Sequence, residues 1–287
     1  SRAAEIVKEL RRLVLAADND GLVETNRNLG QWLRGLRTHK FVDATQHVPV
    51  KLIDFEDLGN NKLVVSEEVT YGTIGHKARF DIVLWINGIP LVIGETKTAV
   101  DQKISCHQAV SEIVAHYEPN WPGFFVPNVF SFGTEGKELA YGTVGAPVAA
   151  WELWGPSQVK PKLADVLRAA ESLLAPATVL TLLRDYTLFE TPEDNASTSL
   201  RKLIARYMQY DAVELVTARA HEGEKRRGLI YHTQGTGKTL AMVFAAAKML
   251  RDPELGNPTI ILIADRVQLV RQMWDQFRTT GMPRLMV

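Results

Sequence analysis

The sequence is poor in several features that would each point to a particular class of protein. It contains a single cysteine, Cys106, so no internal disulfide can form, and a lone cysteine is more often a small buried hydrophobe than a catalytic thiol. No run of about 18 apolar residues is present, which predicts no membrane-spanning helix. The first residues hold no apolar signal-peptide core. We therefore expect a soluble cytoplasmic protein.

An excess of charge of one sign is also lacking. Lys and Arg total 33, Asp and Glu total 33, and the formal net charge is +0. Because phosphate contacts supply most of the non-specific affinity for nucleic acids, DNA binding would need a local basic surface. Residues 201–227 hold seven Lys or Arg and four Asp or Glu, although such charged runs are usually solvated faces.

What is present is an ordinary globular composition and a length of 287 residues, which fits one large domain or two modest ones. Hydrophobic spacing predicts helices at residues 3–17, 28–36, 102–117, 158–185, 200–220, 238–250 and from 267 onward. Apolar, β-branched runs predict strands at residues 48–56 and 62–70 (a hairpin), 80–86, 89–97, 126–132, 138–144, 228–232 and 259–264. The best linker candidate is residues 191–199.

The most informative hairpin turns at Asn87-Gly88, a dipeptide typical of type I′ turns. Asp81 and Glu95 lie 14 residues apart with this turn near the middle, so antiparallel pairing brings their carboxylates together. Glu95 and Lys97 are i and i+2 on one strand and share a face. The two acids would hold Mg²⁺, which prefers oxygen ligands, polarises a phosphate and acidifies a bound water. Lys97 would orient that water or stabilise charge on the phosphate.

The alternative for this hairpin is a solvated strand face with a surface ion pair, which is a common role for Glu-x-Lys. Catalysis is favoured because Glu95 ends an apolar run, as expected in a central strand. An acid also lies at the right offset across a tight turn, and a nucleotide-binding motif follows downstream.

That motif occupies residues 232–239, which read His-Thr-Gln-Gly-Thr-Gly-Lys-Thr and end in the Walker A pattern. Gly235 and Gly237 would let backbone N–H groups turn around phosphates, at the positive end of the following helix. Lys238 would reach the β- and γ-phosphates, and Thr239 would ligate Mg²⁺. Histidine replaces the usual first glycine. A glycine-rich turn without nucleotide is the alternative, but the predicted strand–loop–helix–strand order is the opening of a parallel α/β domain.

Residues 77–97 closely resemble the nuclease motif of type I restriction enzyme R subunits, where an Arg-Pro-Asp strand runs through Asn-Gly-x-Pro into Glu-x-Lys. Phe80 stands where that family usually has proline. The family also carries a Gln-x-x-x-Tyr pair on the next helix, where Tyr117 matches the tyrosine and Ile113 holds the glutamine position. Other candidate site residues are Gln108 or Glu112 as the substitute for that glutamine, and Glu24 as a further acid.

The phosphate-binding motif is similar to that of the same family, and residues 205–210 resemble the adenine-reading Q element of superfamily 2 helicases. This resemblance implies that Gln209 selects adenine; outside that context such a helix is usually plain surface. Arg266, after the second predicted strand of this region, would contact a DNA phosphate or simply be an exposed basic residue.

The resemblance implies an α/β protein. A PD-(D/E)xK endonuclease domain, a mixed sheet flanked by helices, would occupy residues 1–157, and a helical connector and linker residues 158–199. Residues 200–287 would begin the first RecA-like lobe of a superfamily 2 motor. An acidic Walker B strand and a second lobe are not among the 287 residues, so we read the chain as the front part of such a subunit, with weak nucleotide binding and no DNA-stimulated turnover.

The implied function is Mg²⁺-dependent cutting of double-stranded DNA coupled to ATP-driven translocation, in a prokaryotic cytoplasm. Asp81, Glu95 and Lys97 would be catalytic. The partners would be double-stranded DNA and the modification (methyltransferase) and specificity subunits. Two other hypotheses stay open: a stand-alone helicase–nuclease of DNA repair, and a non-catalytic DNA-binding or assembly module.

Overall fold

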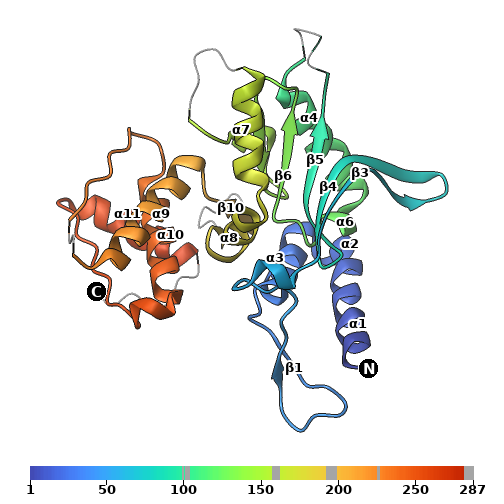
Figure 1. Cartoon of the computed structure of the whole chain (residues 1–287), viewed down its shortest axis with the longest axis horizontal. Coiled ribbons are helices and arrows are strands. Elements are labelled where there is room, and N and C mark those ends of the chain that lie inside the picture. Colours follow the sequence, from blue (N-terminus) through green and yellow to red (C-terminus); the bar gives the residue numbers. More distant parts are fainter. Residues whose placement is uncertain (99, 101–103, 157–161, 192–198, 225–226, 281–287) are drawn as a thin grey trace. The chain divides into compact units, whose positions relative to one another are not determined.

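The computed structural model describes residues 1–98, 100, 104–156, 162–191, 199–224 and 227–280. The chain divides into two compact units, Ser1–Arg184 and Asp185–Val287 (Figure 1). The border between them falls inside the predicted connector, and the finer three-part division stays a prediction. Among the described residues no single helix is long and apolar enough to cross a membrane. Helices α7 (Leu163–Leu174) and α8 (Pro176–Asp185) reach that length and composition only as a pair, bent by 58°.

The first unit is built on a six-stranded sheet (Figure 1), and this sheet is mixed, as the sequence predicts. Its strands, in spatial order, are β3 (Leu63–Thr73), β4 (His76–Ile86), β5 (Ile89–Thr96), β6 (Phe130–Thr134), β7 (Leu139–Gly142) and β8 (Glu152–Leu153). Strands β5 and β6 are parallel, and the other neighbours are antiparallel. A separate short pair joins β1 (Thr38–His39) to β2 (Val48–Pro49).

The turn between β4 and β5 is the predicted Asn-Gly hairpin. Asn87 and Gly88 have φ values of 53° and 79°, the left-handed conformation that a type I′ turn needs at both positions. The Asn87 side chain also donates to Leu52 O at 2.8 Å and accepts from Lys62 N at 2.8 Å. The turn is therefore held from both sides, which fixes the register of the two strands that carry the candidate acids.

Helices cover this sheet. Those of the first unit, besides α7 and α8, are α1 (Arg2–Leu15), α2 (Ala17–Asp20), α3 (Leu22–Leu33), α4 (Cys106–Glu112), α5 (Glu118–Asn120), α6 (Pro122–Phe125), the π-helix η2 (Ile113–Tyr117), and the short 3₁₀ turns η1 (Leu58–Asn60) and η3 (Val148–Ala150). Helix α4 packs against β5, β6 and β7. Helix α3 is tied down by Asn26, whose amide donates to Val126 O and Asn128 O, both at 2.8 Å.

The core of the first unit lies between the sheet and these helices. Phe80, which is fully buried, stacks on Phe124 with ring centroids 4.5 Å apart and meets Tyr117 edge-on at 5.0 Å. Such aromatic pairs add about 0.5–1.5 kcal/mol beyond the area that they bury. Phe80 is thus a packing residue beside Asp81, and it anchors the strand that presents this acid.

The described residues of the second unit form one short sheet and three longer helices. Its elements are β9 (Thr187–Glu190), β10 (Arg201–Ile204), α9 (Tyr207–Glu222), α10 (Lys238–Arg251), the 3₁₀ turn η4 (Pro253–Leu255) and α11 (Val267–Thr279). Strands β9 and β10 pair antiparallel, and α9 packs on α10. Buried Tyr186 joins these parts, since its hydroxyl donates to Glu214 Oε1 at 2.6 Å. The predicted helices at 238–250 and from 267 are confirmed.

Several predicted elements are wrong in the first unit. Residues 62–70 do form a strand, but it pairs with β4 and not with residues 48–56, of which only Val48–Pro49 is a strand. The intervening residues turn through hydrogen bonds of their own side chains, which compete with strand pairing. The helix expected at 28–36 runs over Leu22–Leu33, and the strand expected at 126–132 begins at Phe130.

The second unit departs further from prediction. The helix expected from residue 200 starts at Tyr207, because Arg201–Ile204 pairs with β9 instead. Residues 228–232 and 259–264 are not strands, and Ile261 and Ile263 are 77% and 90% exposed. A strand needs a neighbour for its backbone hydrogen bonds, and neither segment has one in the part of the chain that the structure describes. Most of the predicted linker, 192–198, lies outside the described residues.

Candidate active site

Asp81 and Glu95 face each other across β4 and β5. The pairing of these strands places Ile82 opposite Gly94, and the same register puts Asp81 opposite Glu95 one position further on. Directly opposed residues of an antiparallel pair project from the same face. The Asp81 carboxylate is fixed through Oδ2, which accepts from Thr96 N at 2.9 Å and Thr96 Oγ1 at 2.8 Å. This agrees with the predicted convergence of the two acids.

Glu95 is a buried carboxylate, only 3% exposed. Its Oε1 accepts from Lys97 Nζ at 2.7 Å, whereas its Oε2 is buried without a hydrogen bond from any described residue. Burial, together with the negative charge of Asp81, raises the pKa of Glu95 although Lys97 opposes the shift. A buried oxygen without a donor, next to a second carboxylate, is an arrangement that a cation would stabilise.

Lys97 is held by two acids at once. Besides Glu95 it forms an ion pair with Glu112 Oε2, from the end of α4. Burial opposes its charge, but the hydrogen bonds with Glu112 and Glu95 prevail and raise the pKa of Lys97. Its backbone N–H donates to Thr134 O at 2.8 Å, which extends the β5–β6 pairing by one residue. Lys97 is therefore a fixed, charged ammonium beside Glu95.

The three other candidate residues, Gln108, Glu112 and Glu24, differ in whether they contact this cluster. Of the two proposed substitutes for the family glutamine, Glu112 contacts Lys97, whereas Gln108 is exposed. Glu24 pairs with Arg27 of its own helix. In the described ranges, no group of three or more His, Cys, Asp and Glu side chains is arranged to hold a metal ion. Two carboxylates nevertheless suit Mg²⁺, which usually keeps several waters.

The phosphate-binding loop of the second unit has the predicted turn. Gly235 and Gly237 have φ values of 84° and 74°, a left-handed conformation that glycine adopts at little cost. Helix α10 begins directly after them at Lys238. The Lys238 ammonium donates to Thr233 O at 3.1 Å, back across its own loop. Backbone N–H groups at a helix start form an anion-binding site, so these residues fit a nucleotide phosphate.

Gln209 lies against this loop and is only 1% exposed. Its Nε2 donates to Thr236 O at 3.2 Å and Gly237 O at 3.1 Å, and its Oε1 accepts from Arg206 N at 2.9 Å. The side chain predicted to select adenine thus binds the loop backbone and its own helix start. In the structure, Gln209 connects α9 to the phosphate-binding loop by hydrogen bonds. Its role in adenine selection stays a prediction.

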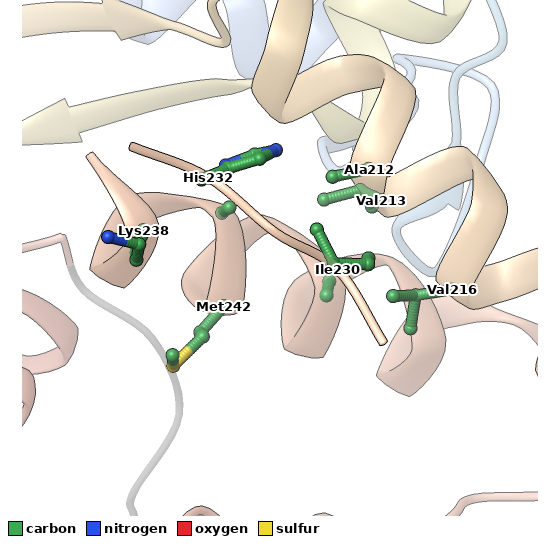
Figure 2. A pocket seen from close by; sticks show the side chains of 9 residues that line it. Ala212, Val213, Val216, Ile230, His232, Lys238 and Met242 are labelled. Atoms are coloured by element: carbon green, nitrogen blue, oxygen red, sulfur yellow. The ribbon is translucent and has the colours of Figure 1, made fainter. Parts of the chain in front are cut away.

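A mainly apolar pocket of about 160 Å³ adjoins this loop (Figure 2). Its wall is formed by residues of α9 and α10 and by the segment before the loop, namely Ala212, Val213, Val216, Ile230, His232, Lys238, Ala241, Met242 and Ala245. Pockets for organic ligands usually measure roughly 300–1,000 Å³. This cavity is smaller, so it does not by itself form a nucleotide pocket.

Comparison with known families settles the relationship of the chain. Residues 2–150 match the family described as Type I restriction enzyme R protein N terminus (HSDR_N), which is more than half of the chain. The chain belongs to this family. Residues 208–286 of the chain also match the family described as SWI2/SNF2 ATPase.

Its relatives agree with this assignment. The chain is 31% identical over 274 residues to the type I restriction enzyme HindI endonuclease subunit of Haemophilus influenzae, covering 91% of this chain and 26% of that protein. It is 24% identical over 273 residues to the type I restriction enzyme SauMSSORF170P endonuclease subunit of Staphylococcus aureus, covering 94% and 27%. The chain therefore spans about a quarter of the length of these relatives.

Proposed function

We propose that this chain carries the DNA-cutting site of a type I restriction enzyme R subunit, in a nuclease domain of the PD-(D/E)xK kind. The observation that carries the proposal is the cluster of Asp81, Glu95 and Lys97, with a buried Glu95 oxygen that no described donor satisfies. Family membership supports it, since the relatives above are named endonuclease subunits. The predicted nuclease domain of residues 1–157 would lie within the first compact unit.

Each residue of the cluster has a distinct task in this proposal. Asp81 and Glu95 would hold Mg²⁺, and the Thr96 hydrogen bonds keep Asp81 in place for it. A bound Mg²⁺ supplies positive charge that polarises the scissile phosphate. Lys97 orients the attacking water or stabilises the negative charge that develops on the phosphate. Its ion pairs with Glu95 and Glu112 keep it charged for that role.

We further propose that residues 200–287 begin a RecA-like motor lobe that binds ATP. Support comes from the SWI2/SNF2 ATPase match and from the loop geometry at Gly235 and Gly237. Lys238 would leave Thr233 O to contact the β- and γ-phosphates, and Thr239 would hold Mg²⁺ with the nucleotide. ATP-driven translocation on double-stranded DNA is proposed for the whole subunit.

The partners proposed are double-stranded DNA and the modification and specificity subunits of a type I complex. They rest on the names of the relatives, which are subunits of restriction enzymes. The predicted prokaryotic, cytoplasmic location stays a prediction.

The experiment that tests the function compares DNA cutting with ATP hydrolysis in the full-length protein. With Mg²⁺, ATP and the partner subunits, Asp81→Ala, Glu95→Ala and Lys97→Ala should each abolish cleavage of duplex DNA. ATP hydrolysis should stay near the wild-type rate, because the two sites lie in separate compact units. Cleavage by all three variants at the wild-type rate would favour the non-catalytic DNA-binding or assembly module. Loss of both activities together would contradict separate sites.

A further inference from the structure

A π-helix brings Glu112, one of the two candidate substitutes for the family glutamine, to the nuclease cluster. Helix α4 ends at Glu112, and the chain continues as η2, the π-helix Ile113–Tyr117. In an α-helix, residues four apart lie one turn apart on the same face, so Ile113 would lie beside Tyr117. In a π-helix the spacing is five residues, so Glu112 lies beside Tyr117 instead. Ile113 is indeed fully buried in the apolar core, and Tyr117 donates to Glu112 Oε1 at 3.3 Å.

Glu112 uses its two oxygens for two different elements. Oε1 accepts from Tyr117 on the π-helix, and Oε2 forms the ion pair with Lys97 after β5. The Tyr117 hydroxyl also lies 3.3 Å from Arg79 O. Strand β4, which pairs with β5, therefore helps to fix the position of the Tyr117 hydroxyl. Glu112 therefore links the helix that covers the sheet to the lysine at the end of β5.

The contact between Glu112 and Lys97 matters because Glu95 has two partners to serve, Lys97 and the metal ion. Its Oε1 is bound to Lys97 at 2.7 Å, yet the same carboxylate would also hold the metal ion. The lysine side chain is long and flexible, so an ammonium bound only to Glu95 would be displaced when a cation takes that carboxylate. A second acceptor that is not a metal ligand keeps the ammonium in position.

We propose that Glu112 is a positioning residue of the nuclease site: it holds the Lys97 ammonium at the reacting phosphate while Glu95 serves the metal ion. The inference rests on the proposed nuclease function and adds a residue to it. In this assignment Glu112 acts through Lys97: its Oε2 pairs with Lys97 and its Oε1 accepts from Tyr117, whereas Glu95 keeps Oε2 without a hydrogen bond from the described residues and so available to the metal ion.

The test measures cleavage and metal binding in the full-length protein with its partner subunits. Glu112→Met keeps length and helix propensity but offers no oxygen acceptor, whereas Glu112→Gln keeps an acceptor for Lys97. We expect Glu112→Met to lower kcat about 10–100-fold, as loss of outer-shell partners typically does, with KM for DNA and affinity for Mn²⁺ unchanged. Glu112→Gln should recover most of the rate. Ser111→Ala, at the exposed neighbouring position, is the matched control and should match wild type.

Two results would overturn the inference. Wild-type kcat in Glu112→Met would show that Lys97 needs no second acceptor, and loss of Mn²⁺ binding in that variant would show that Glu112 is itself a ligand. If Glu112→Met fails to fold, Glu112→Ala supplies the same comparison with Glu112→Gln. Failure of the proposed function looks different, since Asp81→Ala and Glu95→Ala would then cut like wild type.

Discussion

At the scale of single residues, the site depends on how tightly Glu95 is surrounded. The residue before it, Gly94, has no side chain because the ring of Phe132 on β6 fills the space: an added Cβ would lie 2.2 Å from that ring. Glu95, the next residue of β5, is itself only 3% exposed. A buried acid with a raised pKa is a common mark of a functional site.

Gly94→Ala should therefore lower the free energy of unfolding by on the order of 1–3 kcal/mol, the usual cost of overpacking. Gly30→Ala is the matched control, since a Cβ there meets nothing within 4 Å on helix α3, and it should stabilise by about 0.5–1 kcal/mol. Chemical denaturation followed by circular dichroism measures both. A Gly94→Ala variant as stable as wild type would show that Phe132 on β6 shifts at little cost. Adding Phe132→Leu to Gly94→Ala should restore part of the lost stability.

How far the sequence predicts this site depends on the range of the interactions. Asp81 and Glu95 are predictable because one local turn, Asn87-Gly88, sets their register. The sequence names Glu112 as a candidate only beside Gln108, because helical spacing assumes 3.6 residues per turn and the π-helix, which decides between them, breaks that rule. The resemblance predicts that Gln209 selects adenine, but its hydrogen bonds to the loop backbone depend on the packing of α9 against α10, which residue spacing does not reveal.

At the scale of elements, the loop between β2 and β3 shows how side chains can replace a strand. Asp54 accepts from the backbone N–H groups of Glu56 and Asp57 and from the Asn60 amide, all within 3.0 Å. Asn61 in turn accepts from Asp54 N and receives a hydrogen bond from Asn87. The predicted hairpin at 48–56 and 62–70 failed for this reason: the sequence pattern counts apolar residues and does not weigh a carboxylate that organises the turn.

The hydrogen bonds to Asp54 in this turn should make the free energy of unfolding depend on pH. The hydrogen bonds from Asp57, Asn60 and Glu56 lower the pKa of Asp54 below its ordinary 3.8. A carboxyl whose pKa is lower in the folded state adds stability above its unfolded pKa and loses it as the pH falls through the folded value. Asp54→Asn should thus be less stable than wild type at pH 7, and the difference should vanish in strong acid. Denaturation at a series of pH values tests this. Asn60→Ala, which removes one donor, should show a smaller effect of the same sign; a pH-independent difference for Asp54→Asn would contradict it.

At the scale of the whole molecule, the chain divides into two compact units. The sequence predicts the β4–β5 hairpin of the first unit, because that pairing is local. The predicted strands 228–232 and 259–264 do not form, although α10 between them does. A helix satisfies its own backbone, whereas a parallel strand depends on neighbours distant in sequence.

The two units should therefore unfold in separate transitions. Phe244→Ala, at a fully buried position of α10, should cost about 3–5 kcal/mol and shift only the transition of the second unit. Gly94→Ala should shift only the other. Scanning calorimetry of the chain distinguishes the outcomes: a single transition that moves with both variants would mean that the units fold as one.

The central claim is that Asp81 and Glu95 form one divalent-metal site in the first unit. Calorimetric titration of Mn²⁺ into the 287-residue chain at neutral pH, without nucleotide, tests it most directly. We predict one bound ion for wild type, no measurable binding in Asp81→Asn or Glu95→Gln, and unchanged binding in Asp265→Asn, an exposed aspartate of the second unit. Wild-type affinity in both Asp81→Asn and Glu95→Gln would contradict the account.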